Sequence, residues 1–162
     1  MFEFERSAVG RCYFSTISFG SDDALTIRLD TCASRSVIAI NKFSESVRSD
    51  IRDRLEKALN DGSVSIWKSR VANGTEMDTY LCSINDVILA GVTMKKFYFW
   101  LSLAEASDVA VIGYDIIDEI SLTHNIHGAF YSSAGFSEDD YIRSYNGFKS
   151  IDLTAVFKEL SV

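Results

Sequence analysis

The first third of the chain alternates between hydrophobic and polar positions. Residues 12–19 are rich in aromatic and β-branched side chains, and residues 25–29 alternate strictly between apolar and polar types. Between them, residues 20–23 form a turn cluster of Gly, Ser and two Asp. The pattern predicts a β-hairpin that ends at Asp30, followed by a tight loop and a further strand at residues 37–40.

Residues 44–60 follow a different pattern, in which apolar side chains recur at three- and four-residue steps among charged ones. This spacing predicts an amphipathic surface helix packed on the sheet. Ser44 or Ser46 is the expected N-terminal cap, and residues 60–62, Asn-Asp-Gly, are expected to end the helix in a left-handed turn. The charged face carries both signs, which is typical of solvated surface rather than of a binding site.

The middle of the chain predicts three further β segments, at residues 64–71, 77–88 and 92–103. The turn signals Asn73-Gly74 and Ala90-Gly91 separate them, and the first pair is a strong hairpin signal. The aromatic run at residues 97–100 is expected to lie in the core of the sheet.

The last part of the chain begins with a nearly continuous apolar run at residues 109–120, which predicts a buried strand that turns into a short helix. A strand is expected at residues 129–132, a polar acidic loop at 137–140, and an amphipathic helix from about Asp152. The apolar face of this last helix would consist of Leu153, Val156, Phe157 and Leu160. The predicted fold is therefore mostly β, with one amphipathic helix, a short helix after Gly113 and a C-terminal helix.

Composition narrows the class of protein. The 162 residues suit one domain, and 47% hydrophobic with 24% charged residues predicts a folded globular chain. The net charge of −7 is the wrong sign for a surface that follows phosphates, so nucleic acid is not an expected partner. Proline is absent, so Gly, Asn and Asp must supply the turns.

The cysteines and the apolar runs indicate the compartment. Cys12, Cys32 and Cys82 are an odd number at wide spacings without a C-x-x-C pair, which favours a reducing compartment over a disulfide framework and gives no zinc pattern. The N-terminus lacks the pattern of a secretory signal, and the longest apolar stretch is too short to span a membrane. We expect a soluble, cytoplasmic protein without a membrane partner.

The most informative stretch reads Leu25-Thr-Ile-Arg-Leu-Asp30-Thr31-Cys32-Ala33-Ser34. A carboxylate placed where an apolar strand leaves the core is costly unless it is paired or hydrogen-bonded. Asp30 is therefore a candidate catalytic residue. The alternative is that Asp30 and Ser34 cap a turn.

This stretch resembles the active-site signature of the retropepsin-like aspartic proteases, in which a hydrophobic strand runs into Asp-Thr/Ser-Gly-Ala-Ser/Thr. A second family motif, two apolar residues followed by Gly and a helical turn, is similar to Val111-Ile112-Gly113. Between the two motifs, Ala72-Asn73-Gly74 resembles the turn of the family's flap hairpin. The resemblance covers about residues 10–122 and implies a single retropepsin-like barrel domain over residues 1–162, with 123–162 as a C-terminal extension.

The resemblance implies an aspartic endopeptidase that acts as a homodimer on an extended peptide or protein substrate. The chain carries one signature, because Asp78-Thr79 is followed by Tyr80 and is no second copy, so each subunit would contribute Asp30 to a dyad that activates a water. Thr31 would brace that dyad. No metal or organic cofactor is implied.

One departure from the family pattern leaves a second hypothesis open. Cys32 stands where the family has the glycine that allows close approach of backbone and substrate. The alternative function is therefore a retropepsin-like module that has lost catalysis and serves as a dimerising peptide-binding scaffold. His124 and His127 are interpreted as ordinary polar residues rather than metal ligands, because no Glu or Cys ligand pattern accompanies them.

Overall fold

The computed structural model describes residues 2–6, 12–20, 24–30, 33–70, 74, 76–117, 122–124, 130–132 and 136–158. The fold is mostly β, as predicted. The strands are β1 (Glu3–Arg6), β2 (Tyr13–Ser18), β3 (Ala24–Leu29), β4 (Val37–Ala39), β5 (Ile66–Arg70), β6 (Glu76–Leu89), β7 (Val92–Ser102), β8 (Ala110–Ile112), β9 (Leu122–His124), β10 (Phe130–Ser132) and β11 (Ile151–Asp152). The helices are a 3-10 turn, η1 (Ile40–Lys42), and α1 (Glu45–Asp61), α2 (Tyr114–Ile117), α3 (Glu138–Ser144) and α4 (Thr154–Lys158).

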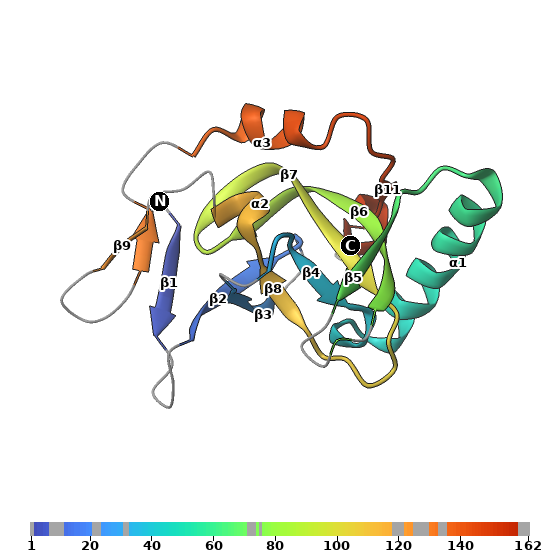
Figure 1. Ribbon diagram of the computed structural model, residues 1–162, viewed down its shortest axis with the longest axis horizontal. Helices are drawn as coiled ribbons and strands as arrows, with labels where there is room; N and C mark the ends of the chain where they lie inside the picture. The colour runs from blue at the N-terminus through green and yellow to red at the C-terminus, as the bar shows by residue number, and fades with distance from the viewer. Residues whose placement is uncertain are drawn as a thin grey trace.

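Six strands close into a barrel (Figure 1). The order β6-β7-β4-β8-β3-β2 returns to β6 through a short antiparallel pairing in which Ile17 lies opposite Leu89. The long hairpin of β6 and β7 forms the largest part of this sheet. Its aromatic run, Phe97 to Trp100, is buried as predicted, because β7 has covered surfaces on both of its faces in this segment.

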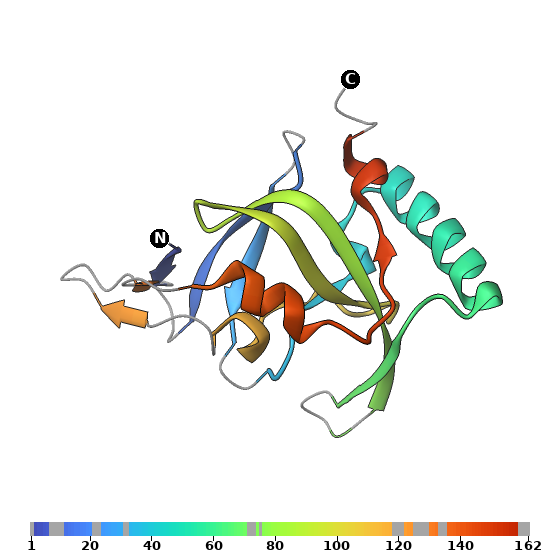
Figure 2. The same ribbon diagram turned by 90° about the horizontal axis from the view of Figure 1, so that it is seen from above.

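The predicted hairpins of the barrel are confirmed. β2 and β3 pair antiparallel along their whole length, and β5 pairs with the start of β6, from Glu76 to Tyr80. The turn between β6 and β7 places Ala90 at φ 49° and Gly91 at φ 84°, the two left-handed positions that the tightest hairpin turns require. The hairpin formed by β5 and the start of β6 extends away from the barrel (Figure 2).

Two groups of strands extend the barrel at its margins. β1 pairs with both β2 and β10, and β10 pairs with β9. On the other side, β11 pairs parallel to β6, with Ile151 opposite Cys82. The C-terminal part of the chain therefore contributes a strand to the main sheet.

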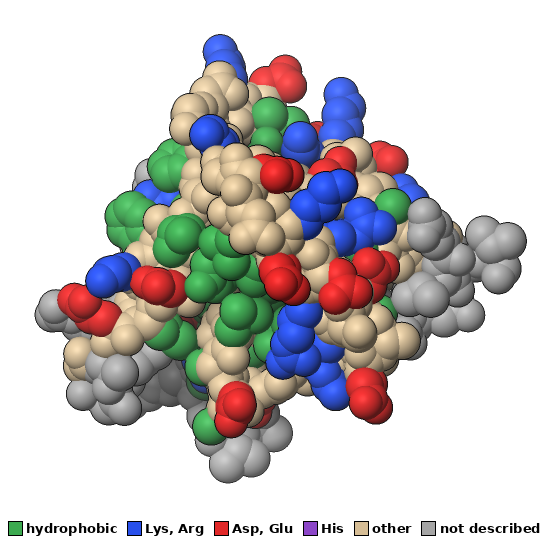
Figure 3. Space-filling model, turned by 90° about the vertical axis from the view of Figure 1, so that its right-hand side faces the viewer, with side chains coloured by type: hydrophobic (Ala, Val, Ile, Leu, Met, Phe, Trp, Pro, Cys, Tyr) green, Lys and Arg blue, Asp and Glu red, His purple; other side chains and the backbone are tan. Residues whose placement is uncertain are grey.

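The predicted amphipathic helix is α1, which buries Val47, Ile51 and Leu55 on one face. It ends at Gly62 in the left-handed conformation that the sequence predicts, with φ 68°. The predicted capping is wrong in one respect. Ser44 occupies the N-cap position, but its side chain makes no capping hydrogen bond and instead lies 3.4 Å from the Ser46 hydroxyl. Acidic and basic side chains intermingle on this side of the molecule, beside an apolar area (Figure 3).

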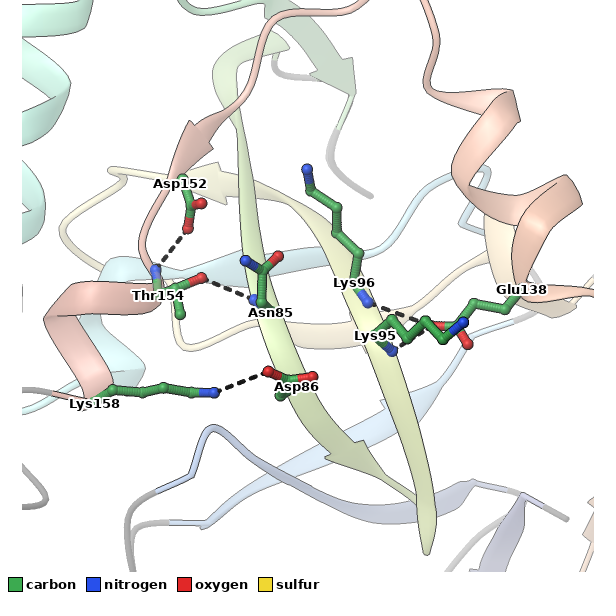
Figure 4. A network of polar contacts seen from close by, with 8 residues as sticks. All are labelled: Asn85, Asp86, Lys95, Lys96, Glu138, Asp152, Thr154 and Lys158. Carbon is green, nitrogen blue, oxygen red and sulfur yellow. Dashed lines mark hydrogen bonds and ion pairs between the residues drawn. The ribbon is translucent and has the colours of Figure 1, made fainter.

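The predicted acidic loop at residues 137–140 is wrong, because this segment begins α3. The Ser137 side chain accepts a hydrogen bond from the Asp140 N–H, and three acidic residues fill the first turn, where the helix dipole favours negative charge. The carboxylate of Glu138 accepts hydrogen bonds from the N–H groups of Lys95 and Lys96, which fasten α3 to β7 (Figure 4). The acidic run that suggested a loop is a helix start.

The last helix, α4, begins at Thr154, two residues later than the predicted start at Asp152, which belongs to β11. The Asn85 N–H donates to the Thr154 hydroxyl at 2.9 Å, and the Lys158 ammonium lies 3.3 Å from the Asp86 carboxylate (Figure 4). Three of the four apolar residues predicted on this face are buried, Leu153, Val156 and Phe157, and Leu160 lies outside the described residues. No helix in the described part of the chain is long and apolar enough to cross a membrane.

Candidate functional site

Asp30 directly follows β3, as the sequence predicts. Its N–H donates to the Ile112 carbonyl at 2.9 Å, and its own carbonyl accepts from the Ala33 N–H at 3.2 Å. The side chain is 28% exposed, and its carboxylate lies 3.8 Å from the guanidinium of Arg28, whose side chain is 51% exposed. An ion pair of this length between partly exposed side chains contributes little to stability. Arg28 therefore does not hold the Asp30 carboxylate in a fixed pair. Thr31 and Cys32 lie outside the described residues.

The two sequence motifs meet in the barrel. β8 lies between β3 and β4, parallel to the first and antiparallel to the second, although β3 and β4 are consecutive along the chain. The loop after Asp30 must therefore pass around the end of β8. The Tyr114 N–H donates to the Ala33 carbonyl at 2.9 Å, which ties this loop to the start of α2.

Gly113 allows the end of β8 to approach the backbone of the loop after Asp30 closely. A Cβ atom added to Gly113 would lie 2.5 Å from the backbone carbon and oxygen of Arg35, closer than real side chains approach backbone. Glycine is needed here for space. Ile112, the preceding motif residue, is fully buried opposite Leu29.

A polar network joins this loop to α2 and to the C-terminal part of the chain. The Ser36 hydroxyl donates to Oδ1 of Asp115 at 2.8 Å and accepts from the Gly113 N–H at 3.2 Å. Oδ1 also accepts from the Ile116 N–H, and Oδ2 accepts from the Tyr145 hydroxyl at 2.7 Å. Oδ1 therefore holds the loop between Asp30 and β4 through Ser36, and Oδ2 connects the same carboxyl group to Tyr145.

Burial shifts the titration of this network. Desolvation raises the pKa of Asp115 above its ordinary value, although the hydrogen bonds from Tyr145 and Ser36 act in the opposite direction. Desolvation also raises the pKa of the Tyr145 hydroxyl, and the neighbouring Asp115 charge adds to this effect. The raised pKa keeps the Tyr145 hydroxyl protonated, and so a hydrogen-bond donor to Asp115, above the pH at which an ordinary tyrosine loses its proton.

Sequence reasoning missed Ser36, Asp115 and Tyr145 as parts of the site. Ser36 lies in the loop that carries the signature, and Asp115 interrupts an apolar run, so both left a signal in the sequence. Tyr145 left none, because it comes from a segment far along the chain that only the tertiary fold brings to α2.

A pocket of about 420 Å³ opens beside the loop. Ser34 lines it, as a residue of the predicted active-site loop, whereas Asp30 does not. The other lining residues come from the same loop, from β5 and α2, and from the end of α3 and the segment after it. They are Arg35, Trp67, Tyr114, Asp115, Ser144, Tyr145 and Phe148.

The predicted flap lies mostly outside the described residues, as do Ala72 and Asn73. Gly74 adopts φ 85°, and the strands on either side of it pair with Arg70 opposite Glu76, so the predicted hairpin is present. Within the described ranges, no group of three or more His, Cys, Asp or Glu side chains could hold a metal ion.

Comparisons with known proteins add a distant structural likeness. No protein-family model matches the chain, and neither does any curated protein. Among solved structures, the fold is similar to the crystal structure of a retropepsin-like aspartic protease from Rickettsia conorii. The likeness covers 82% of this chain and 92% of that chain, with 12% sequence identity and a TM-score of 0.47.

Proposed function

We propose that the protein is an aspartic endopeptidase that acts as a homodimer, with Asp30 as its catalytic residue. The observation that carries the proposal is the position of Asp30 at the end of β3. The loop that follows packs against the end of β8, where Gly113 contacts the Arg35 backbone closely. The main chain of Asp30 is held by Ile112, while its side chain is 28% exposed. A fixed backbone under a partly exposed side chain suits a group that must meet a second carboxylate and a water.

Dimerisation follows from the chemistry. Activation of water by this route needs two carboxylates that share one proton, and the sequence supplies one signature. A twofold axis close to Asp30 would bring two copies of the residue together. One carboxylate would take a proton from the water as the oxygen attacks the scissile carbonyl carbon, and the other would donate its proton to the leaving amide nitrogen. The products are a new carboxyl group and a new amine.

Thr31 would brace the dyad in this proposal, and the segment around Gly74 would cover an extended peptide bound by main-chain hydrogen bonds. Ala33 and Ser34 would continue the active-site loop beside the peptide. The part of the chain that the structure describes adds α2 and Tyr145 as supports of that loop, through the Asp115 carboxylate.

A second candidate function is a dimerising peptide-binding module without catalysis. The observation that favours it is Cys32, which stands where close approach to the carboxylate calls for glycine. Both candidate functions predict a dimer that binds a peptide, and they differ only in whether the peptide is cleaved.

A peptidase assay with Asp30→Asn tests the proposal. The unmodified chain should cleave a library of extended peptides most rapidly at mildly acidic pH, because the dyad must keep one shared proton. Asp30→Asn should lower the rate by about a thousandfold or more, since an amide cannot act as general base. Sedimentation should give the same dimer for both proteins.

Three results would contradict the proposal. Equal cleavage by the Asp30→Asn variant would exclude Asp30 as the catalytic residue. A strictly monomeric active species would exclude the shared dyad. Dimerisation and peptide binding without any cleavage would favour the second candidate.

A further inference from the structure

The pocket beside the active-site loop gathers side chains that are unusual on a protein surface. Trp67, Tyr114 and Phe148 line it and are 40%, 45% and 38% exposed. Large aromatic side chains exposed together around a concave surface indicate a site that another molecule covers. They come from β5, α2 and the segment after α3, so the tertiary fold rather than one element assembles them.

Arg35 lies among aromatic rings at this pocket. Its guanidinium carbon is 4.0 Å from the centre of the Trp67 ring, 5.1 Å from that of Trp100 and 5.3 Å from that of Phe148. A cation placed over the face of an aromatic ring is attracted by the ring quadrupole, which positions the Arg35 guanidinium at the pocket. None of these ring contacts is a hydrogen bond to a carboxylate, the acceptor that the guanidinium fork matches.

No carboxylate among the described residues lies within 4.0 Å of the Arg35 guanidinium. Among the described residues, Asp115 is the only acidic side chain that lines the pocket, and its two oxygens already accept from Ser36, Ile116 and Tyr145. A half-buried guanidinium that is oriented but not ion-paired favours an incoming anion.

The shape and charge of the site favour a carboxylate as the anion that binds. A carboxylate matches the two parallel N–H groups of a guanidinium, and apolar groups next to it would cover the exposed aromatic rings. A nucleic acid would need several cations along its backbone, and the chain as a whole carries a net charge of −7.

We propose that this pocket binds an Asp or Glu side chain of an extended peptide, with Arg35 as the residue that selects the carboxylate. The inference rests on the proposed function for the peptide nature of the ligand. Ser34 and Arg35 follow Asp30 within one short loop, so a peptide that passes over Asp30 can reach the pocket with a neighbouring side chain. The protein would then prefer acidic residues near the bond it cleaves.

Binding can be measured without cleavage in the full chain carrying Asp30→Asn. The probes are two fluorescein-labelled hexapeptide pools with apolar flanks, identical except for a central Glu in one pool and Gln in the other. Fluorescence anisotropy should give about tenfold tighter binding for the Glu pool, the size expected for a charge-assisted pair. Arg35→Gln in the same background should reduce this preference to less than about twofold.

The matched control is Arg52→Gln, which makes the same change of charge on the exposed face of α1 and should keep the preference. Arg35→Lys keeps the charge but loses the planar fork, and should retain only part of the preference. Circular dichroism would show whether each variant is folded, and the comparison of the two pools on the parent chain needs no Arg35 variant.

Equal affinity of the parent chain for the two pools would overturn the inference, and so would a Glu preference that survives Arg35→Gln. Displacement of the Glu pool by inorganic phosphate at lower concentration than by glutarate would also overturn it, because the pocket would then be a phosphate site. Failure of the proposed function is distinguishable, since it would appear as absent cleavage by the unmodified chain while the Glu preference persists.

Discussion

The Cα of Gly113 faces the backbone of Arg35 so closely that an added Cβ would lie 2.5 Å from the Arg35 carbonyl carbon. This contact joins the two sequence motifs of the candidate site, one in the loop after β3 and the other at the end of β8. The same contact therefore restricts the backbone of the loop that carries both Asp30 and Arg35. Any atom added at Gly113 must move the loop that carries both residues.

Gly113→Ala should therefore destabilise the fold by about 3 kcal/mol, because the obstacle is backbone and cannot turn aside. Urea unfolding monitored by circular dichroism would measure the free energy of unfolding. Gly62→Ala is the control, since a Cβ there meets nothing within 4 Å and only the left-handed φ of 68° is strained, at about 1 kcal/mol. Equal losses in the two variants would show that the contact with Arg35 is not tight.

Asp115→Asn should change how stability depends on pH. Burial raises the pKa of Asp115, so the folded state keeps its proton to higher pH than the unfolded state does. Between the two pKa values the folded state binds more protons, and stability falls as pH rises. The amide that replaces the carboxyl group does not titrate, so the variant does not lose stability in this way. The free energy of unfolding of Asp115→Asn should therefore increase relative to that of the unmodified chain as the pH rises from 4.

Urea unfolding at a series of pH values would measure this difference, with Asp53→Asn on the exposed face of α1 as the control. The control makes the same change of side chain at an exposed position, away from the Ser36 and Tyr145 hydroxyls. A gain in the relative stability of the unmodified chain with rising pH would contradict the inference that burial raises the pKa of Asp115.

Tyr141→Phe should loosen α3 from the barrel. The buried Tyr141 hydroxyl accepts from the Tyr98 N–H at 2.8 Å and donates to the Tyr98 carbonyl at 3.3 Å. Its removal leaves a buried N–H of β7 without a partner and should cost about 1–3 kcal/mol. Tyr114→Phe, at an exposed hydroxyl, should change stability by less than about 0.5 kcal/mol in the same thermal or urea unfolding experiment.

Cys32→Gly should raise peptide cleavage, because it restores the glycine of the signature beside Asp30. Reductant should increase the activity of the unmodified chain, whose thiol can be oxidised, and should leave that of the variant unchanged. A peptidase assay on both proteins with and without reductant measures this. Rapid turnover of the unmodified chain that ignores reductant and falls in the variant would show that Cys32 does not hinder catalysis.

Local patterns in the sequence determined most of the elements of this fold. The alternation before Asp30, the Ala90-Gly91 turn and the helical spacing before Gly62 each predicted an element that the structure contains. These signals are local, because strand alternation, left-handed turns and helix faces depend on residues that are close along the chain. The same locality misled at Glu138, where an acidic run suited a loop as well as a helix start.

The sequence also located Asp30 and Gly113 as members of two separate motifs. Only the tertiary structure decided that these motifs interlock, since β8 enters between β3 and β4 from about eighty residues further along the chain. It also decided that the Tyr145 hydroxyl donates to Asp115 and that the Arg35 guanidinium lies over the Phe148 ring. Contacts between distant segments depend on how the whole barrel closes, and no periodicity within a single segment records that closure.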